Sequence, residues 1–574
     1  MISPFINYQK SKQFKLACWY TLQDDPDVIG GYLDAGSLYA TNKLSEGRND
    51  NWHVTSQLLA NYMRTFGKHD LTLMAGFENY YMKSESLSAA RDQYELTNYP
   101  YLNIGSEDFQ TNSGTGSEYT SNSFFGRLLY SYANRYLFQA NVRRDGSSRF
   151  AKNYRWGTFP SFSAGWVVSE EPFMKKANMP WLSYFKLRAS WGKLGNERIG
   201  SNYFPYIALM SFGSTLFYMA DGSVVSGSTA RPAVLAVEDI TWETTTSTDL
   251  GFDANFLNNR LHVNFDYYWK KTTDMLLAIQ IPYTMGYNQP NTNAGKMSTH
   301  GYDIDVSWQD HIGDFKYGIS VNFSDYLSKI DYLNNSDIIS GGKVKRAGVL
   351  FNEYYGYICD GIYQTKEEVN NSARTSSTVT VGDLKYRDIS GPDGVPDGKI
   401  SPEYDRVPLG NSLPRYQYGG NLNASWKGID LSIAFQGIGK QNSYLSSAMV
   451  QPFRNNYGNV PAIIDGKYWS PFNTDAENAQ AKYPRLSNVS KDNNYATSSY
   501  WLFNGRYFRL KNVTLGYTLP KQWTKYVGID RTRLYVSGSD LFCISNFPKG
   551  WDPEMGTSAY PITTSLVVGI QVNF

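Results

Sequence analysis

The sequence predicts an all-β protein, an antiparallel transmembrane β-barrel, and three observations support this fold class. Apolar and polar residues alternate with a period of two over stretches of about ten residues, and the pattern recurs along the whole chain. Between these stretches, short polar turns alternate with long polar connections. Aromatic residues reach 16% while charged residues make up 18%, a mixture that suits rings lying between lipid and water.

The alternation is clearest at the end of the chain. Leu566, Val568, Ile570, Val572 and Phe574 share one face of an extended segment. The opposite face carries the residues between them, which are Val567, Gly569, Gln571 and Asn573. A tilted strand of about nine residues is long enough to cross a bilayer. We therefore expect a membrane strand whose first face contacts lipid.

About sixteen segments of the chain show this alternation, and a barrel strand is expected from each. They lie near 12–22, 54–64, 70–81, 122–132, 136–144, 158–169, 183–191, 246–256, 261–271, 301–309, 314–325, 415–426, 430–437, 506–518, 531–542 and 566–574.

The connections follow a parity along the chain. Short turns are expected after even-numbered strands, at 66–68, 133–135, 257–260, 311–314 and 427–430. Long polar stretches follow odd-numbered strands, at 82–121, 192–245, 326–414 and 438–505. Outer-membrane barrels have short periplasmic turns and long extracellular loops, whereas a soluble sandwich has no reason to keep such a parity.

Composition excludes several other classes. The net charge is +2, which gives no electrostatic basis for nucleic-acid binding. The chain has no run of 18 apolar residues that would indicate a transmembrane helix. Its first residues lack the basic and apolar regions of a secretory signal. Cys18, Cys359 and Cys543 are too far apart in the sequence to suggest a disulfide framework, so we interpret them as unpaired thiols.

Motifs for catalysis or metal binding do not stand out in the sequence. The five histidines show no HExxH spacing, and neither a G-x-S-x-G elbow nor a phosphate-binding loop occurs. We therefore expect no enzyme, no cofactor and no metal site. The stretch 388–400 is similar to a calcium loop, but Val395 and Tyr404 stand where ligands are needed. A surface loop stiffened by Gly, Pro and Asp is the favoured interpretation.

Several motifs along the chain resemble the SusC/RagA-type family of TonB-dependent outer-membrane transporters, known from Bacteroidetes. The matching segments are RRDGSSRF (143–150), RWG (155–157), LRASWG (187–192), WETTTSTDLGFD (242–253), DYYWKKTTDML (266–276), YGYICDGIYQ (355–364), GDLKYRDI (382–389), YFRLKNVTLGYTLP (507–520), RLYVSGSDLF (533–542) and WDPE (551–554). We interpret these motifs as structural. Asn258, Asn259 and Gly146 suit tight turns, and the Trp and Tyr clusters suit girdles at the membrane interface.

The resemblance implies a barrel of about 22 strands, of which residues 1–574 would form the C-terminal portion without the plug domain. It implies a signal peptide, a TonB-interacting segment and a plug outside this sequence, so a fragment of a longer chain is expected. A smaller closed barrel is the other arrangement, because an open sheet edge in hydrocarbon leaves backbone groups unpaired.

The resemblance also implies a function. The complete protein would import oligosaccharides or peptides across the bacterial outer membrane, using energy delivered by TonB. A SusD-like surface lipoprotein would be its partner. A plug-free passive porin or a surface adhesin is the alternative, and a soluble carbohydrate-active β protein is a third class. Residues that contact the substrate are not identified by these motifs.

The last strand also resembles the assembly signal of bacterial outer-membrane proteins, because it ends in an aromatic residue on its apolar face. Leu566, Val568, Ile570, Val572 and Phe574 are therefore predicted to be read by the barrel assembly machinery.

Overall fold

The fold is seen in a computed structural model of the chain. The structure describes residues 2–19, 43–96, 99, 101–199, 203–208, 210–232, 235–278, 281–334, 337–446, 450–453, 460–524, 528–556, 560 and 562–573, the first of these ranges by its backbone alone.

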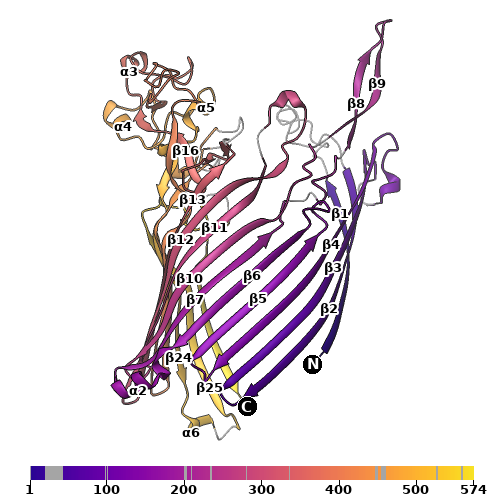
Figure 1. Ribbon diagram of the computed structural model, residues 1–574. Helices are drawn as coiled ribbons and strands as arrows, with labels where there is room; N and C mark the ends of the chain where they lie inside the picture. Colours follow the sequence, from indigo (N-terminus) through magenta and orange to yellow (C-terminus); the bar gives the residue numbers. More distant parts are fainter. Residues whose placement is uncertain are drawn as a thin grey trace. The chain divides into compact units, whose positions relative to one another are not determined.

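A sixteen-stranded antiparallel sheet dominates the chain, in the order β1-β2-β3-β4-β5-β6-β7-β10-β11-β12-β13-β20-β21-β24-β25-β26 (Figure 1). Its strands are β1 (Ile2–Trp19), β2 (Lys43–Phe66), β3 (His69–Asp92), β4 (Gln110–Tyr132), β5 (Tyr136–Ser147), β6 (Trp156–Val167), β7 (Leu182–Asn196), β10 (Glu243–Phe256), β11 (Leu261–Ala278), β12 (Asn291–Ile312), β13 (Phe315–Leu333), β20 (Arg415–Trp426), β21 (Ile429–Lys440), β24 (Tyr507–Thr518), β25 (Arg531–Ser545) and β26 (Ser565–Asn573). The expected all-β fold and the expected number of strands are confirmed.

The chain divides into two compact units. The first comprises residues 1–164, 191–246 and 272–294, and the second comprises residues 165–190, 247–271 and 295–574. Each unit is described by itself below.

The register of the second unit confirms the expected alternation. Val568 of β26 pairs with Val536 of β25, which pairs with Leu515 of β24, which pairs with Leu431 of β21. This row lies on one face of the sheet. Gln571 pairs with Arg533 on the other face, which we call the polar face. In a transmembrane barrel, alternation of this kind separates a lipid face from a lumen face.

The strands are longer than the alternation predicted. The stretch 82–121 was expected to be a loop, but β3 continues to Asp92, β4 begins at Gln110, and the two strands pair over this region. Its residues are polar on both faces, as in the pair Ser84 and Ser117. An antiparallel ladder is held by backbone hydrogen bonds, so it continues where the alternation that marks lipid contact has stopped. The same reason explains the early starts of β2 and β12 and the late end of β13.

The five expected short turns join the predicted strand pairs. At 257–260, Asn258 and Asn259 have φ values of +58° and +63°, which Asn tolerates better than most residues. Gly146 is different, because it lies inside β5 and the ring of Trp156 lies 2.9 Å from where its Cβ would be. The prediction of a turn at Gly146 was wrong, since close packing rather than a turn requires glycine there.

The parity of the connections holds with three exceptions. The β6–β7 connection contains the helix α2 (Pro172–Ala177) and the 3₁₀ turn η3 (Val168–Glu170), and the β24–β25 connection contains α6 (Lys521–Thr524). These even-numbered connections are therefore longer than a tight turn. The β5–β6 connection at 148–155 is compact although it follows an odd-numbered strand.

The long connections contain secondary structure of their own. In the first unit, β8 (Met210–Tyr218) and β9 (Val224–Pro232) form a hairpin, accompanied by the turns η2 (Leu102–Ile104) and η4 (Tyr283–Met285). In the second unit the small elements are β14 (Ile338–Ser340), β15 (Lys343–Lys345), β16 (Glu353–Tyr357), β17 (Cys359–Ile362), α3 (Lys366–Asn370), β18 (Leu384–Tyr386), β19 (Arg406–Asn411), β22 (Asn442–Tyr444), η5 (Ala462–Ile464), α4 (Asp475–Ala479), α5 (Lys491–Asn494), η6 (Ser499–Trp501) and β23 (Leu502–Asn504).

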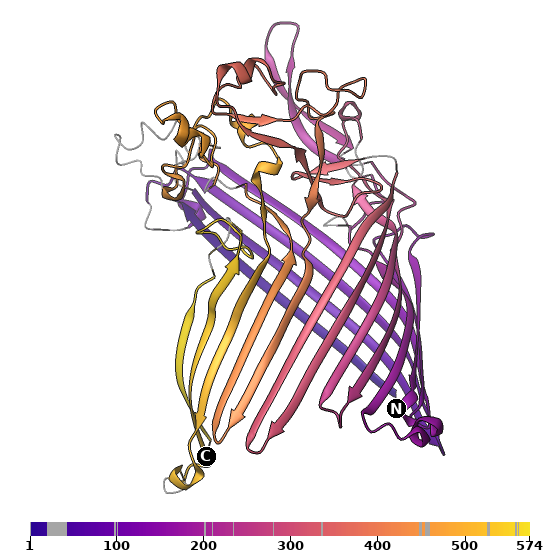
Figure 2. The same ribbon diagram turned by 90° about the vertical axis from the view of Figure 1, so that its left-hand side faces the viewer.

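Within the second unit, these small elements gather at one end of the orange and yellow strands, and the short turns lie at the other end (Figure 2). Among the described residues, none of the helices combines the length and apolar character needed to span a bilayer.

Candidate functional site: the polar face and the connections above it

Two long connections of the second unit fold together, and we call their described residues (337–411, 442–446, 450–453 and 460–504) the two-loop module. The backbone N–H of Tyr357 donates to the carbonyl of Thr497 at 2.9 Å, and that of Arg485 donates to the carbonyl of Gly382 at 2.8 Å. Tyr357 and Ser498 also form a parallel bridge. Backbone pairing therefore joins the two connections directly.

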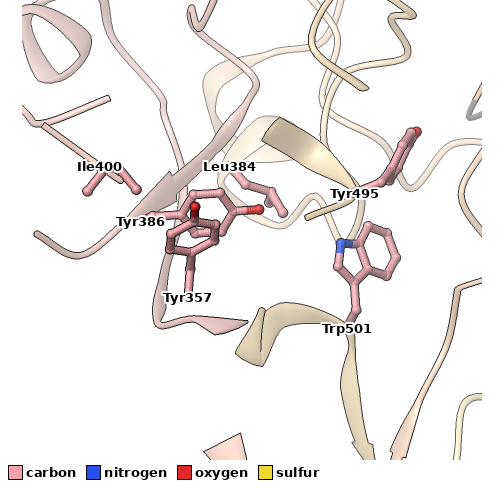
Figure 3. Close-up of a cluster of buried hydrophobic side chains, with 6 residues drawn as sticks. All are labelled: Tyr357, Leu384, Tyr386, Ile400, Tyr495 and Trp501. Atoms are coloured by element: carbon pink, nitrogen blue, oxygen red, sulfur yellow. The ribbon is translucent and has the colours of Figure 1, made fainter. Parts of the chain in front are cut away.

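An aromatic core joins the same two connections (Figure 3). The first connection supplies Tyr357, Leu384, Tyr386 and Ile400, and the second supplies Tyr495 and Trp501. Trp501 is 1% exposed, and its indole N–H donates to the carbonyl of Asn494 at 2.8 Å. Burying each large apolar side chain contributes about 1.5 to 3 kcal/mol. The module therefore has a hydrophobic core of its own.

A buried carboxylate links the two connections through polar contacts. Asp383 is fully buried and accepts from Nε of Arg485 at 2.7 Å, the hydroxyl of Ser490 at 2.8 Å and Nδ2 of Asn494 at 2.9 Å. The backbone N–H of Thr380 donates to it as well, at 2.9 Å. A buried charge is tolerated only when it is paired and hydrogen-bonded, so these donors explain why an aspartate can lie there.

Close backbone contacts leave no room for side chains at two glycines of the module. A Cβ on Gly356 would lie 2.1 Å from the carbonyl oxygen of Thr497. Gly382 has a φ of +88°, and a Cβ there would lie 2.3 Å from the ring of Trp469. Glycine allows both the left-handed backbone and the close approach.

Cys359 begins β17 beside this core. Burial raises the pKa of its thiol to about 11, and the backbone N–H of Cys359 donates to the hydroxyl of Ser499 at 2.9 Å. A thiol with a raised pKa carries little of the reactive thiolate at neutral pH. Cys359 is a free cysteine, as the sequence predicts.

Ion pairs line the polar face of the second unit. Arg533 pairs with Asp430. On neighbouring strands, Arg188 lies 3.0 Å from both Asp253 and Asp266, which adds three residues to the same charged lining. The charges are of both signs, and a wall of this kind suits a polar solute rather than an apolar one.

A cavity of about 540 Å³ lies on this unit near the short turns. Its lining includes hydroxyl and amide side chains of β12, β13, β20 and β21, with charged groups at one end. The lining residues of the polar face are Ser307, Gln309, His311, Lys316, Gly318, Ser320, Asn423, Ser425, Asp430 and Ser432. The volume falls in the range of small-molecule sites, about 300 to 1,000 Å³.

A second cluster on the polar face fixes the β25–β26 connection. Arg509 of β24 is 3% exposed and lies 2.6 Å from Asp552 and 2.7 Å from Glu554. Gln436 of β21 also donates to Glu554, at 3.1 Å. Two sequence motifs, at 507–520 and 551–554, are thus joined by one arginine. Sequence reasoning missed this contact, although the arginine of one motif and the acids of the other were the available signal.

The first unit has an aromatic and charged cluster beside β4 and β5. Tyr119 donates to Glu197 at 2.5 Å, and Arg149 lies 4.4 Å from the ring centre of Tyr203. Arg143, from the motif at 143–150, pairs with Asp145 at 2.7 Å. In this motif the charged side chains are therefore held by neighbours within the unit.

The predicted assembly-signal residues lie on the face opposite to the polar one. Leu566, Val568, Ile570 and Val572 are exposed, and their register partners in β25 include Val536 and Leu534. Phe574 lies outside the described residues. The structure does not bring these residues into contact with the polar face.

Carboxylates within and just after the stretch 388–400 hold its backbone. Asp388 accepts from the backbone N–H of Gly398 at 2.7 Å, and Asp397 accepts from that of Lys399 at 3.0 Å. Asp405 accepts from the backbone of Ile389 at 2.7 Å. Within the part of the chain that the structure describes, no group of His, Cys, Asp and Glu could hold a metal ion.

Comparison with known proteins places this geometry in a family. A family model described as TonB dependent receptor-like, beta-barrel matches residues 4–538. TonB-dependent receptor P3 of Formosa agariphila is 29% identical over 547 residues, which cover 92% of this chain and 51% of that protein. TonB-dependent receptor SusC of Bacteroides thetaiotaomicron is 28% identical over 565 residues, which cover 95% of this chain and 52% of that protein.

Among solved structures, the RagAB peptide transporter matches with a TM-score of 0.79 at 22% identity, covering 100% of this chain and 60% of that chain. At this identity the match shows the fold alone. The chain spans about half the length of the curated relatives it matches. These matches confirm the resemblance to SusC/RagA-type proteins and the outer-membrane location of the family. Because the family model covers most of its residues, the chain belongs to the TonB-dependent receptor-like β-barrel family.

Proposed function

We propose that the complete protein imports large nutrients, oligosaccharides or peptides, across the outer membrane in a TonB-dependent manner. Residues 1–574 would supply the C-terminal portion of its barrel, with the short turns in the periplasm and the long connections outside the cell. The observation that carries the proposal is the two-faced sheet, with exposed Val568 on one side and the Arg533–Asp430 pair on the other. A wall of this kind separates lipid from a polar passage.

The relatives support the finer parts of the proposal. SusC of Bacteroides thetaiotaomicron is named a TonB-dependent receptor, and the RagAB structure is titled a peptide transporter. We infer a SusD-like surface lipoprotein as the partner, lying on the long connections. The two-loop module offers it a preformed surface, because its core fixes the positions of the exposed residues.

Uptake measurements test this function. The gene for the full-length protein would be deleted in its host, and labelled oligosaccharides and peptides would be offered to the cells with and without TonB. We expect the deletion and the loss of TonB to abolish uptake of the same substrate. Uptake that persists without TonB would identify a passive porin instead. Binding to the cell surface without any uptake would identify an adhesin.

We also propose that Leu566, Val568, Ile570, Val572 and Phe574 act as the signal read by the barrel assembly machinery. The shared exposed face of the first four supports this role. Deleting Phe574 from the full-length protein should lower its amount in the outer membrane, measured by quantitative blotting of membrane fractions. Substrate binding by the protein that does assemble should be unchanged. Equal abundance with and without Phe574 would contradict the proposal.

A further inference from the structure

Three connections of the second unit are linked in series to the polar face. The first and second connections form the two-loop module, joined by its core and by Asp383. The third is the start of the β25–β26 connection, residues 546–556, which we call the C-terminal connection. It contacts the module through some residues and the strands of the large sheet through others. We call the strands of this sheet in the second unit the wall strands, or the wall.

An apolar contact joins the C-terminal connection to the module. Phe547 packs with Leu445 and Val450 in a buried cluster, with Phe503 and Trp551 against it. The rings of Phe503 and Phe547 meet edge to face, with centroids 6.3 Å apart. Leu445, Val450 and Phe503 all belong to the second connection of the module. Movement of the module would therefore pull on the C-terminal connection.

The other end of the C-terminal connection is fixed to the wall. Arg509 extends from the polar face of β24 and pairs with Asp552 and Glu554. Gln436 of β21 adds a hydrogen bond to Glu554. Arg509 is almost completely buried, so losing its partners would leave a desolvated charge, which is strongly unfavourable. This contact is much stronger than an exposed ion pair.

We propose that the two-loop module and the C-terminal connection form a single cap that moves as one body, latched to the polar face by Arg509. Backbone hydrogen bonds also hold the first connection to β13, where the N–H of Gly348 donates to the carbonyl of Ile330 at 2.8 Å and that of Phe351 donates to the carbonyl of Ser328 at 2.9 Å. The cap can therefore swing only about this attachment, and only when Asp552 and Glu554 leave Arg509. Chains of packed side chains and hydrogen bonds couple distant segments when the elements between them are rigid. The proposal concerns how these connections move, and it stands whatever solute the protein transports.

Hydrogen exchange of the full-length protein in lipid nanodiscs tests the latch. Arg509→Gln keeps a polar side chain of similar reach and removes the charge. We expect exchange to accelerate about tenfold or more in all three connections, while β20 and β21 remain protected. If the Gln variant does not reach the membrane, Asp552→Asn and Glu554→Gln weaken the latch from the other side and should give the same pattern.

A matched control separates the latch from general destabilisation. Arg533→Gln breaks a more exposed ion pair on the polar face, with Asp430 near the short turns, and should leave exchange in the three connections unchanged. Asp383→Asn should loosen the two connections of the module while residues 546–556 stay protected. Faster exchange confined to 546–556 in Arg509→Gln would overturn the single cap. Equal acceleration in Arg533→Gln and Arg509→Gln would overturn the latch.

Discussion

The wall strands and the two-loop module place the same kinds of side chain in opposite surroundings. Val568 in the wall is 75% exposed, whereas Trp501 in the module is 1% exposed. In the wall, apolar side chains face outward because lipid covers them. In the module they face inward because water surrounds them. The solvent on each side, rather than residue type alone, decides where an apolar side chain lies.

Charged groups show the reverse difference. On the polar face, Arg533 and Asp430 pair while both remain partly exposed. In the module, Asp383 is fully buried and needs several donors to be tolerated. An ion pair exposed to water contributes little to the free energy of folding. We therefore expect substitutions in the module to cost more than comparable substitutions on the polar face.

The largest effect is expected in the core of the module. Trp501→Ala removes a buried ring that packs against Tyr483, Tyr495 and Tyr500, and it should reduce the stability of the module by about 3 to 5 kcal/mol. Trypsin should then cleave both connections rapidly in intact outer membranes. Phe472→Ala, at a ring that is 94% exposed in the same module, should leave cleavage unchanged. Loss of the wall strands together with the module would contradict the separation of the two regions.

A somewhat smaller effect is expected on the lipid face of the wall. Lysine at Val568 or Ile570 should destabilise folding into bilayers by about 2 to 4 kcal/mol near the midplane, and by about 0 to 1 kcal/mol nearer the interface. Reversible unfolding in liposomes measures this difference. The two positions lie at different depths along the strand, so at least one should show the full penalty.

The register supplies the control for this series. Gln571 lies opposite Arg533, so Gln571→Lys would place two cations together and cost up to about 1 kcal/mol. Val567 lies opposite Ser537 on the same face, and Val567→Lys should be nearly neutral. If Val567→Lys were as harmful as Val568→Lys, the assignment of the two faces would be wrong.

Removing one hydrogen bond inside the module should lower the stability of the module only modestly. The hydroxyl of Tyr386 donates to the carbonyl of Asn493, and Tyr386→Phe removes this donor while the backbone N–H of Ala496 still donates to the same carbonyl at 3.2 Å. We expect a loss of about 0.5 to 1.5 kcal/mol, seen as faster hydrogen exchange in residues 384–386 and 491–494. Tyr404→Phe, at a half-buried position of the same module, serves as the control. Similar exchange in both variants would argue against a contribution from this hydrogen bond.

The last test changes the protein least, because it uses the alkylation rate of Cys359 to report how readily the module opens. Burial raises the pKa of its thiol to about 11, so at neutral pH the reactive thiolate is scarce and alkylation by iodoacetamide should be slow. The rate should rise as the pH approaches the raised pKa, and it should also rise at neutral pH in Trp501→Ala. Mass spectrometry quantifies the adduct, with Cys359→Ser as the blank. Fast alkylation in the unaltered protein would show that the module opens readily.

The sequence by itself determined the wall. A period of two along 566–573 predicts which side chains share a face, and the register of β25 and β26 confirms it. The turn at Asn258 and Asn259 was also predictable from the sequence, because positive φ values favour Asn over most residues. These features depend on neighbours along one strand or within one turn, so local sequence is sufficient to predict them.

Tertiary structure alone decided the strand ends, the module and the ion pairs of Arg509. The ladder between β3 and β4 extends through polar residues that show no alternation. Asp383 and Arg485 are 102 positions apart in the sequence, and Arg509 meets Asp552 across 43 positions. Such pairs follow no period, and each connection contains many other polar residues that could have been partners. Their choice depends on how the connections pack against one another, which local hydrophobic patterns do not encode.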